Sequence, residues 1–190
     1  MTEQEELPAP SNPLAVARRL LPDWQTEDGH LVCRRWRGSW MRWTGTCWKE
    51  LDEAQMRASM YTRLEHAFYS APGKDGQPEP RDWAPTKQKI GNLLDALGAI
   101  TLLPTDTDAP AWIDREQAGE QDGSPIVACS NGLLRIRDRA LLPHGPGFFN
   151  LVSVPFPYDP QATAPTWEWF LREIWPDDPD AIASLQEWFG

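Results

Sequence analysis

Apolar residues recur with a helical period in the first half of the chain. Their spacing predicts a helix over residues 14–21, capped by Asn12 and opened by Pro13. The same period predicts a helix over 52–70 and another that begins after Thr86. The stripes behind these predictions comprise Leu14, Ala17, Leu20 and Leu21; Met56, Met60, Leu64, Ala67 and Phe68; and Ile90, Leu93, Leu94 and Leu97.

The period changes to that of β-strands in two regions. Residues 30–51 contain short aromatic runs separated by glycine-containing turns, which is typical of a three-stranded antiparallel meander. In the second half, apolar runs at 125–129 and 132–137 flank Asn131-Gly132, a strong signal for a hairpin turn. The pattern therefore predicts one small sheet early in the chain and a second short β region later.

The remaining segments carry loop signals or short helical patterns. Residues 1–11 are acidic and polar, and we expect a disordered arm there. The Pro- and Gly-rich stretch 71–85 predicts an exposed loop. Two prolines place the run 151–158 at a sheet edge or in a loop. Helices are predicted over 167–174 and 181–189.

Together these elements predict an α+β domain over residues 12–190. We expect it to be mostly helical, with a small antiparallel β-meander and a second short β region. Residues 12–104 form a helix–meander–helix part in this interpretation. Residues 105–190 hold the second β region and the exit helices.

Composition excludes several classes of protein. Hydrophobic residues make up 41% of the 190 residues, which is enough to build a packed core. No run approaches the about 20 apolar residues that cross a bilayer, so no membrane partner is expected. The chain has three cysteines and no secretory leader, so we expect reduced thiols and a cytoplasmic location.

The charge is distributed unevenly along the chain. The total is −10, but residues 31–63 hold seven basic and three acidic residues and so carry +4. The rest of the chain carries −14. Because long-range steering follows the summed charge, a polyanion would be attracted only locally, by the 31–63 segment.

The sequence lacks the motifs of the common cofactor and metal sites. It has no G-x-x-x-x-G-K-[ST], G-x-G-x-x-G or H-E-x-x-H, so we predict no catalytic site and no cofactor or metal in this chain. His30, Cys33 and Cys47 could supply zinc ligands, but without a C-x-x-C pair small buried thiols are the more typical interpretation. We interpret the acidic run 177–180 as a turn that caps the last helix, rather than as a cation site.

The basic, tryptophan-rich part of residues 31–63 is the one positive functional signal. Arginine neutralises phosphates and an exposed indole stacks on an unpaired base, so this composition is typical of a surface that binds single strands or junctions. The predicted contacts are Arg34, Arg35, Arg37 and Arg42 for phosphates, and Trp36, Trp40 and Trp43 for bases. The alternative is that strand alternation turns the tryptophans into the core and leaves the arginines to solvate the outside.

The second half of the chain resembles a known family. Its order of short motifs is similar to that of the domain preceding the superfamily 3 helicase motor in phage and plasmid primase–helicases, a family that resembles the poxvirus primase–helicase. The motifs are Asn131-Gly132-Leu133-Leu134, Leu142-Pro143-His144, Tyr158-Asp159-Pro160, Pro165-Thr166-Trp167 and Leu185-Gln186-Glu187 with Gly190. Two positions depart from the pattern: Arg135 stands where the family has an acid, and Gly145 follows His144 where the family has a threonine-like step.

The resemblance implies partners that composition does not. The helicase motor would follow Gly190, so we expect it to be absent from this chain, and ATP and Mg²⁺ would bind only that motor. The full protein would form a homo-oligomeric ring on DNA, either a single strand or a fork, in a bacterial host cell. Its parent chain would be an ATP-dependent DNA helicase, whereas this part would have no catalytic site of its own.

Two functions remain open at this point. In the first, the chain is an accessory domain that supports DNA engagement and ring assembly during replication. In the second, it is a structural collar for oligomerisation that touches only protein. Aromatic anchors are typical of protein interfaces. The candidates for that role are Trp167, Trp169, Trp175 and Trp188.

Overall fold

The helices of the first half begin where their capping residues predict. The structure, a computed structural model, describes residues 5–113 and 123–189. Helix α1 (Pro13–Leu20) is capped by Asn12, whose Oδ1 accepts a hydrogen bond from the N–H of Ala15 at 3.1 Å. A short 3₁₀ turn, η1 (Leu21–Trp24), follows it.

Helices α2 (Glu53–Leu64) and α3 (Lys87–Ile100) have the predicted caps, Asp52 and Thr86. The side chain of each cap accepts hydrogen bonds from first-turn N–H groups, which would otherwise lack partners. The predicted stripes face inward: Met56, Met60, Leu64, Ile90, Leu93, Leu94 and Leu97 are all buried. With α1 they form the main core of the molecule.

The predicted helix over 52–70 is wrong beyond Leu64. Strand β4 (Phe68–Pro72) pairs with β5 (Pro78–Asp82) in an antiparallel hairpin, so most of the expected loop 71–85 is also paired. The backbone N–H of Phe68 donates to the carbonyl of Glu5 at 3.1 Å. The Phe68 carbonyl accepts a hydrogen bond from the N–H of Leu7 at 2.9 Å. Pairing on both sides requires an extended chain, and this overrides the helical pattern.

The amino-terminal arm is also ordered where it is described. Leu7 is 3% exposed and belongs to the main core. The Glu5 carboxylate forms ion pairs with both Arg19 and Arg63. The prediction of a disordered arm is therefore wrong for residues 5–11. Residues 1–4 lie outside the described residues.

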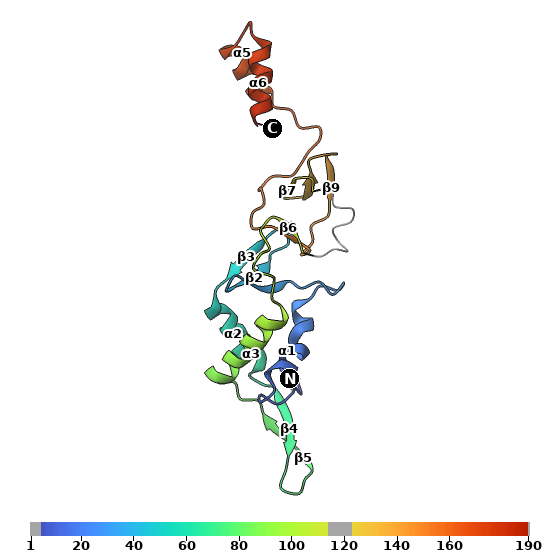
Figure 1. The fold of residues 1–190 in the computed structure, drawn as a ribbon, viewed down its shortest axis with the longest axis vertical. Helices are drawn as coiled ribbons and strands as arrows, with labels where there is room; N and C mark the ends of the chain where they lie inside the picture. The colour runs from blue at the N-terminus through green and yellow to red at the C-terminus, as the bar shows by residue number, and fades with distance from the viewer. Residues whose placement is uncertain (1–4, 114–122, 190) are drawn as a thin grey trace. The chain divides into compact units, whose positions relative to one another are not determined.

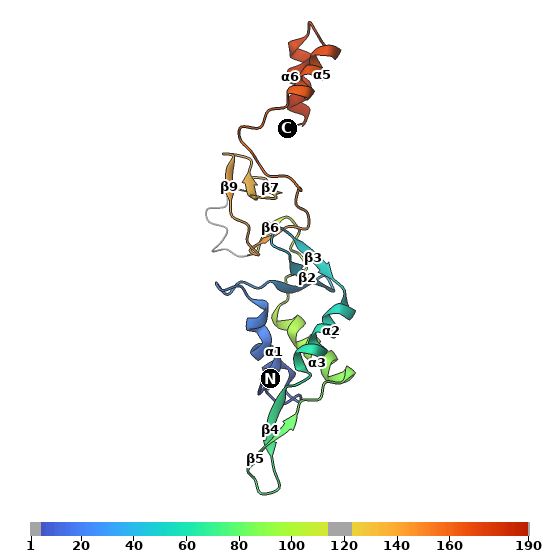
Figure 2. The ribbon, with the colours of Figure 1, turned by 180° about the vertical axis from the view of Figure 1, so that it is seen from behind.

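The three-stranded meander is confirmed. Strands β1 (Cys33–Trp36), β2 (Ser39–Trp43) and β3 (Trp48–Leu51) pair antiparallel in sequence order. In Figures 1 and 2, β2 and β3 lie at one end of the three helices, and the β4–β5 hairpin lies at the other. Buried residues come from both faces of the meander, so the sheet separates two apolar clusters.

The second β region also forms. Strands β7 (Ile126–Cys129), β8 (Gly132–Arg135) and β9 (Ala140–Leu142) make an antiparallel sheet, with the predicted turn between the first two. Gly132 has a φ of +157°, and a Cβ there would lie 2.6 Å from the Leu142 carbonyl oxygen. Only glycine fits this approach.

Two further short strands and an irregular run complete this part of the chain. Strands β6 (Ala111–Trp112) and β10 (Phe148–Phe149) form a separate pair. Within 151–157 no residue is in a strand, in agreement with the predicted loop.

The chain divides into two compact units, Met1–Pro157 and Tyr158–Gly190. The second unit contains α5 (Pro165–Ile174) and α6 (Pro179–Phe189). Asp178 accepts a hydrogen bond from the N–H of Ala181 at 2.9 Å, so the acidic turn caps α6 as predicted. Leu171 is the one buried residue among the side chains described in this unit.

The α+β class is confirmed. The structure adds three strand pairs that the pattern did not predict, β4–β5, β6–β10 and β8–β9. In the described part of the chain, no helix is long and apolar enough to span a bilayer.

Because the amino-terminal arm, residues 5–11, packs on the core, it should contribute to the free energy of unfolding. Leu7→Ala removes a buried side chain and leaves a cavity, so unfolding free energy should fall by about 2–5 kcal/mol in a urea titration. Val152→Ala, at a side chain that is 74% exposed, is the control and should change it by about 0.5 kcal/mol or less. Equal stability of the two variants would mean that the arm is not docked in solution.

Candidate nucleic-acid interface

The residues predicted to bind nucleic acid do not form one surface. Residues that face each other across the strands share a face of the sheet, and the register pairs Cys33 with Arg42 and Arg35 with Trp40. These positions lie on the face toward the main core. Positions Arg34, Trp36 and Trp43 lie on the opposite face, and Arg37 lies in the β1–β2 turn.

Trp40 belongs to the core. Its side chain is 2% exposed, and its ring packs edge-on against Trp24 with 5.5 Å between centroids. No face of this indole is available to a nucleic-acid base. For Trp40 the core alternative is therefore the correct one.

Trp36 and Trp43 are half-buried against the second apolar cluster. The Trp36 ring lies 5.0 Å from Phe149, and its Nε1–H donates to the Thr107 carbonyl at 3.1 Å. Trp43 lies 6.0 Å from Trp48 and 6.5 Å from His144. These contacts give both rings a packing role in the structure.

Arg37 fastens the β1–β2 turn. Its φ of +47° places it in the left-handed region, and its Nε–H donates to the Thr105 carbonyl at 3.0 Å. The guanidinium also pairs with Asp108 and lies 4.6 Å above the Trp36 ring. These partners occupy the side chain and would compete with a phosphate.

Arg42 and Lys49 form the clearest cationic feature of the meander. They face each other across β2 and β3, and both are exposed. Within residues 5–113 and 123–189 the Arg42 guanidinium has no ion pair or hydrogen bond, and Lys49 Nζ donates only to the Leu151 carbonyl, at 3.3 Å. Like charges directly opposite are destabilising. Such a pair is therefore suited to an anion that lies across both strands. Strand alternation could have added Lys49 to the predicted set.

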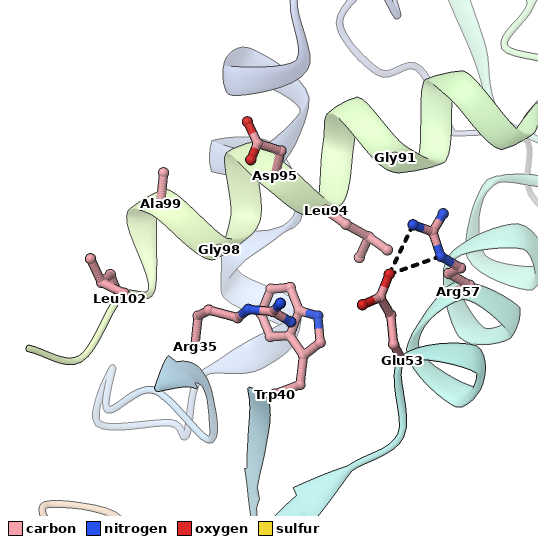
Figure 3. A pocket seen from close by; sticks show the side chains of 10 residues that line it. All are labelled: Arg35, Trp40, Glu53, Arg57, Gly91, Leu94, Asp95, Gly98, Ala99 and Leu102. Atoms are coloured by element: carbon pink, nitrogen blue, oxygen red, sulfur yellow. Dashed lines mark hydrogen bonds and ion pairs between the residues drawn. The ribbon is translucent and has the colours of Figure 1, made fainter. Parts of the chain in front are cut away.

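A pocket of about 370 Å³ lies where the meander meets α2 and α3 (Figure 3). The Arg35 guanidinium lies over the Trp40 ring, 5.1 Å from its centroid. On the α2 side, Glu53 accepts hydrogen bonds from Arg57 at 2.9 and 3.1 Å. Helix α3 contributes Gly91, Leu94, Asp95, Gly98 and Ala99. Sequence reasoning missed this site because its residues come from two strands and two helices that lie apart in the sequence.

The two cysteines of the meander differ in acidity. Burial raises the pKa of the Cys33 thiol to about 12, although the charge of Arg42 opposes this. Burial also acts to raise the pKa of Cys47, but hydrogen bonds and a nearby cation outweigh it and lower the pKa; these partners are Thr44, Ser153, Thr46 and Lys49. No three His, Cys, Asp or Glu residues in the described ranges lie close enough to share a metal ion.

Arg135, one of the two departures from the family pattern, has a local structural role. Its guanidinium donates two hydrogen bonds to Asp138, at 2.9 and 2.7 Å. Asp138 also accepts from the N–H of Ala140, so the pair ties together the β8–β9 turn. The hydrogen bonds from Arg135 lower the pKa of Asp138 to about 2.

The comparisons with known proteins give one family. A family model described as "D5 N terminal like" matches residues 17–176. This match covers more than half of the chain, including the meander, the pocket and α5. No curated protein matches the chain.

The position of Trp40 predicts that its replacement acts on stability. Trp40→Ala should lower the free energy of unfolding by about 3–5 kcal/mol in a urea titration, because it removes a fully packed aromatic side chain. The control is Phe156→Ala, at a side chain that is 60% exposed in the same unit, which should leave that free energy nearly unchanged. If the Trp40→Ala variant is as stable as the wild type, Trp40 does not pack in the core in solution.

Proposed function

The chain belongs to the D5 N-terminal-like family of primase–helicase domains, and on this premise we propose that it is the accessory domain of a phage- or plasmid-type DNA primase–helicase. In this proposal it engages a single strand or a fork during replication. A superfamily 3 motor lies C-terminal to it in the parent protein and uses ATP and Mg²⁺. The domain itself contributes binding and no chemistry.

The observation that carries DNA engagement is the exposed pair Arg42 and Lys49. Two cations side by side on adjacent strands repel each other when nothing lies between them. A phosphate backbone across β2 and β3 removes this repulsion and displaces condensed counterions. Both side chains are already outside the core, so the contact needs no rearrangement of the fold.

The charge of the whole chain supports a local contact. Residues 31–63 carry +4 within a chain of −10. A strand that docks on the meander meets positive charge there, whereas the acidic remainder repels it. The same distribution restricts where on the surface DNA can lie.

The other predicted cations have different roles in this proposal. Arg37 is held by Asp108 and the Thr105 carbonyl, so it supports the turn. Arg34 is half-buried on the opposite face of the sheet. Arg35 lies in the pocket beside Trp40.

The test removes the exposed pair. Arg42→Ala combined with Lys49→Ala should weaken binding of a labelled single-stranded oligonucleotide in fluorescence anisotropy. It should also reduce the slope of log affinity against log salt by about 1.4, which corresponds to two phosphate contacts on a single strand. Both side chains are exposed, so the fold should be unaffected.

The matched control is Arg18→Ala combined with Lys87→Ala. It removes the same charge from exposed positions on α1 and α3, outside the meander. This variant should keep the wild-type salt slope. If both double variants lose the same DNA affinity, net charge governs binding and the meander does not. If the salt slope is unchanged in the Arg42→Ala/Lys49→Ala variant, this pair does not contact DNA.

A second role, in ring assembly, is supported by the unit 158–190. Its helices expose aromatic and apolar side chains that a folded domain ordinarily covers. The most exposed are Trp188 at 90% and Trp169 at 62%, with Phe170 and Ile174 at 47% each. We propose that these side chains are protein contacts in a homo-oligomer, either beside DNA binding or, in a pure collar, in place of it.

Assembly through this unit predicts a change in mass. Trp169→Ala combined with Trp188→Ala should shift the chain toward the monomer in sedimentation velocity across a concentration series, because aromatic anchors carry much of an interface's energy. Phe156→Ala, at a side chain 60% exposed in the first unit, is the control. A wild-type chain that stays monomeric throughout the series, or a double variant that assembles normally, would contradict this role.

A further inference from the structure

We propose that the pocket between Arg35, α2 and α3 binds a single unpaired nucleobase. This inference deepens the proposed function, because it rests on DNA engagement and names the part of the strand that the pocket takes. The pocket is distinct from the Arg42–Lys49 pair, which would hold the backbone. Its volume of about 370 Å³ is that of a small-ligand site.

The charges of the pocket favour a neutral guest. The pocket is lined by two guanidinium groups, those of Arg35 and Arg57, and by two carboxylates, those of Glu53 and Asp95. Their formal charges cancel. A phosphate would be repelled by the carboxylates. A purely apolar group would offer no hydrogen bond to the Arg35 guanidinium or the Asp95 carboxylate, whereas Glu53 and Arg57 already bond to each other.

The shape favours a flat guest. The Arg35 guanidinium lies over the Trp40 ring, which covers one side of this planar group and fixes its orientation. The backbone of Arg35 is fixed as well: its N–H donates to the Thr101 carbonyl at 3.2 Å and its carbonyl accepts from Leu103 at 2.8 Å. Guanidinium planes are established stacking surfaces for unpaired bases.

Helix α3 leaves room for such a guest. A Cβ placed on Gly91 would meet no atom within 4 Å. At Gly98 a Cβ would be 3.7 Å from the Arg35 side chain, in ordinary contact. Figure 3 shows Arg35, Trp40 and Leu94 directed into the space between the helices and the sheet.

The hydrogen-bonding groups predict which bases fit. Glu53 uses Oε1 for Arg57, and in the described part of the chain Asp95 forms no ion pair or hydrogen bond through its carboxylate. Carboxylates accept from amino groups, which cytosine, adenine and guanine carry on their edges and thymine does not. The pocket should therefore prefer amino-bearing bases over thymine.

The test fills the pocket without disturbing the core. Gly91→Met projects a long side chain into the open space, and methionine is a better helix former than glycine, so thermal stability should be equal to or higher than that of the wild type. Gly91→Ala is the matched control, because it changes the helix in the same direction and adds only a methyl group. Both variants keep Arg42 and Lys49.

The readout is anisotropy of labelled dC12 and dT12 with the 190-residue chain. The wild type and Gly91→Ala should bind dC12 about tenfold tighter than dT12, and Gly91→Met should lose this preference. The proposal that the pocket binds a base is contradicted if Gly91→Met keeps the preference for dC12 over dT12, or if the wild type shows no such preference. In those cases, a reduced salt slope on loss of Arg42 and Lys49 would still support the proposed function.

Free deoxycytidine and dCMP separate the possible sources of the base. Saturation transfer from the protein to both should be seen in NMR and should be lost in Gly91→Met. Transfer to both without any binding of dC12 would assign the pocket to a free nucleoside or nucleotide and overturn its role in holding a strand. A Gly91→Met variant that alters only the oligomeric state assigns the pocket to a second copy of the chain and overturns the proposal.

Discussion

The first unit depends on a small sheet that is buried on both faces. Trp40 and Cys33 enter the core built by α1, α2 and α3, whereas Met41 and Trp48 enter the cluster that includes Phe149. Three short strands cannot hold such a position by their ladder bonds alone. Burial of apolar side chains on both sides holds the meander in place, and the meander in turn joins the helical core to the second β region.

This burial decides where charge can lie. Because both faces carry aromatic side chains inward, cations remain only where a strand runs past the core or where a turn projects. Arg42 and Lys49 lie at such a place, Arg37 lies in a turn, and Arg35 is retained at the wall of the pocket. The arginines and tryptophans that alternate in the sequence are thus separated into side chains that pack, side chains that support a turn and side chains that remain exposed.

Membership of the primase–helicase family gives these groups a common context. In the proposals made above, an exposed cationic pair and a neutral pocket of base size are complementary, because one would contact the backbone and the other a single unpaired base. The apolar side chains of 158–190 would serve a separate contact with protein.

The sequence by itself determined the elements that depend on local signals. Asn12, Asp52 and Thr86 cap their helices, the glycine turns of 30–51 separate three strands, and the α+β class and the family resemblance follow from short-range patterns. Tertiary structure decided the features that depend on contacts between residues far apart in the sequence. The arm at residues 5–7 and the strand that begins at Phe68 are ordered because their backbones hydrogen-bond to each other. The inward orientation of Trp40 depends on helices far along the chain. The pocket exists only after two strands of the meander pack against α2 and α3. Local periodicity shows which side of an element is apolar, but only packing determines which neighbour covers it.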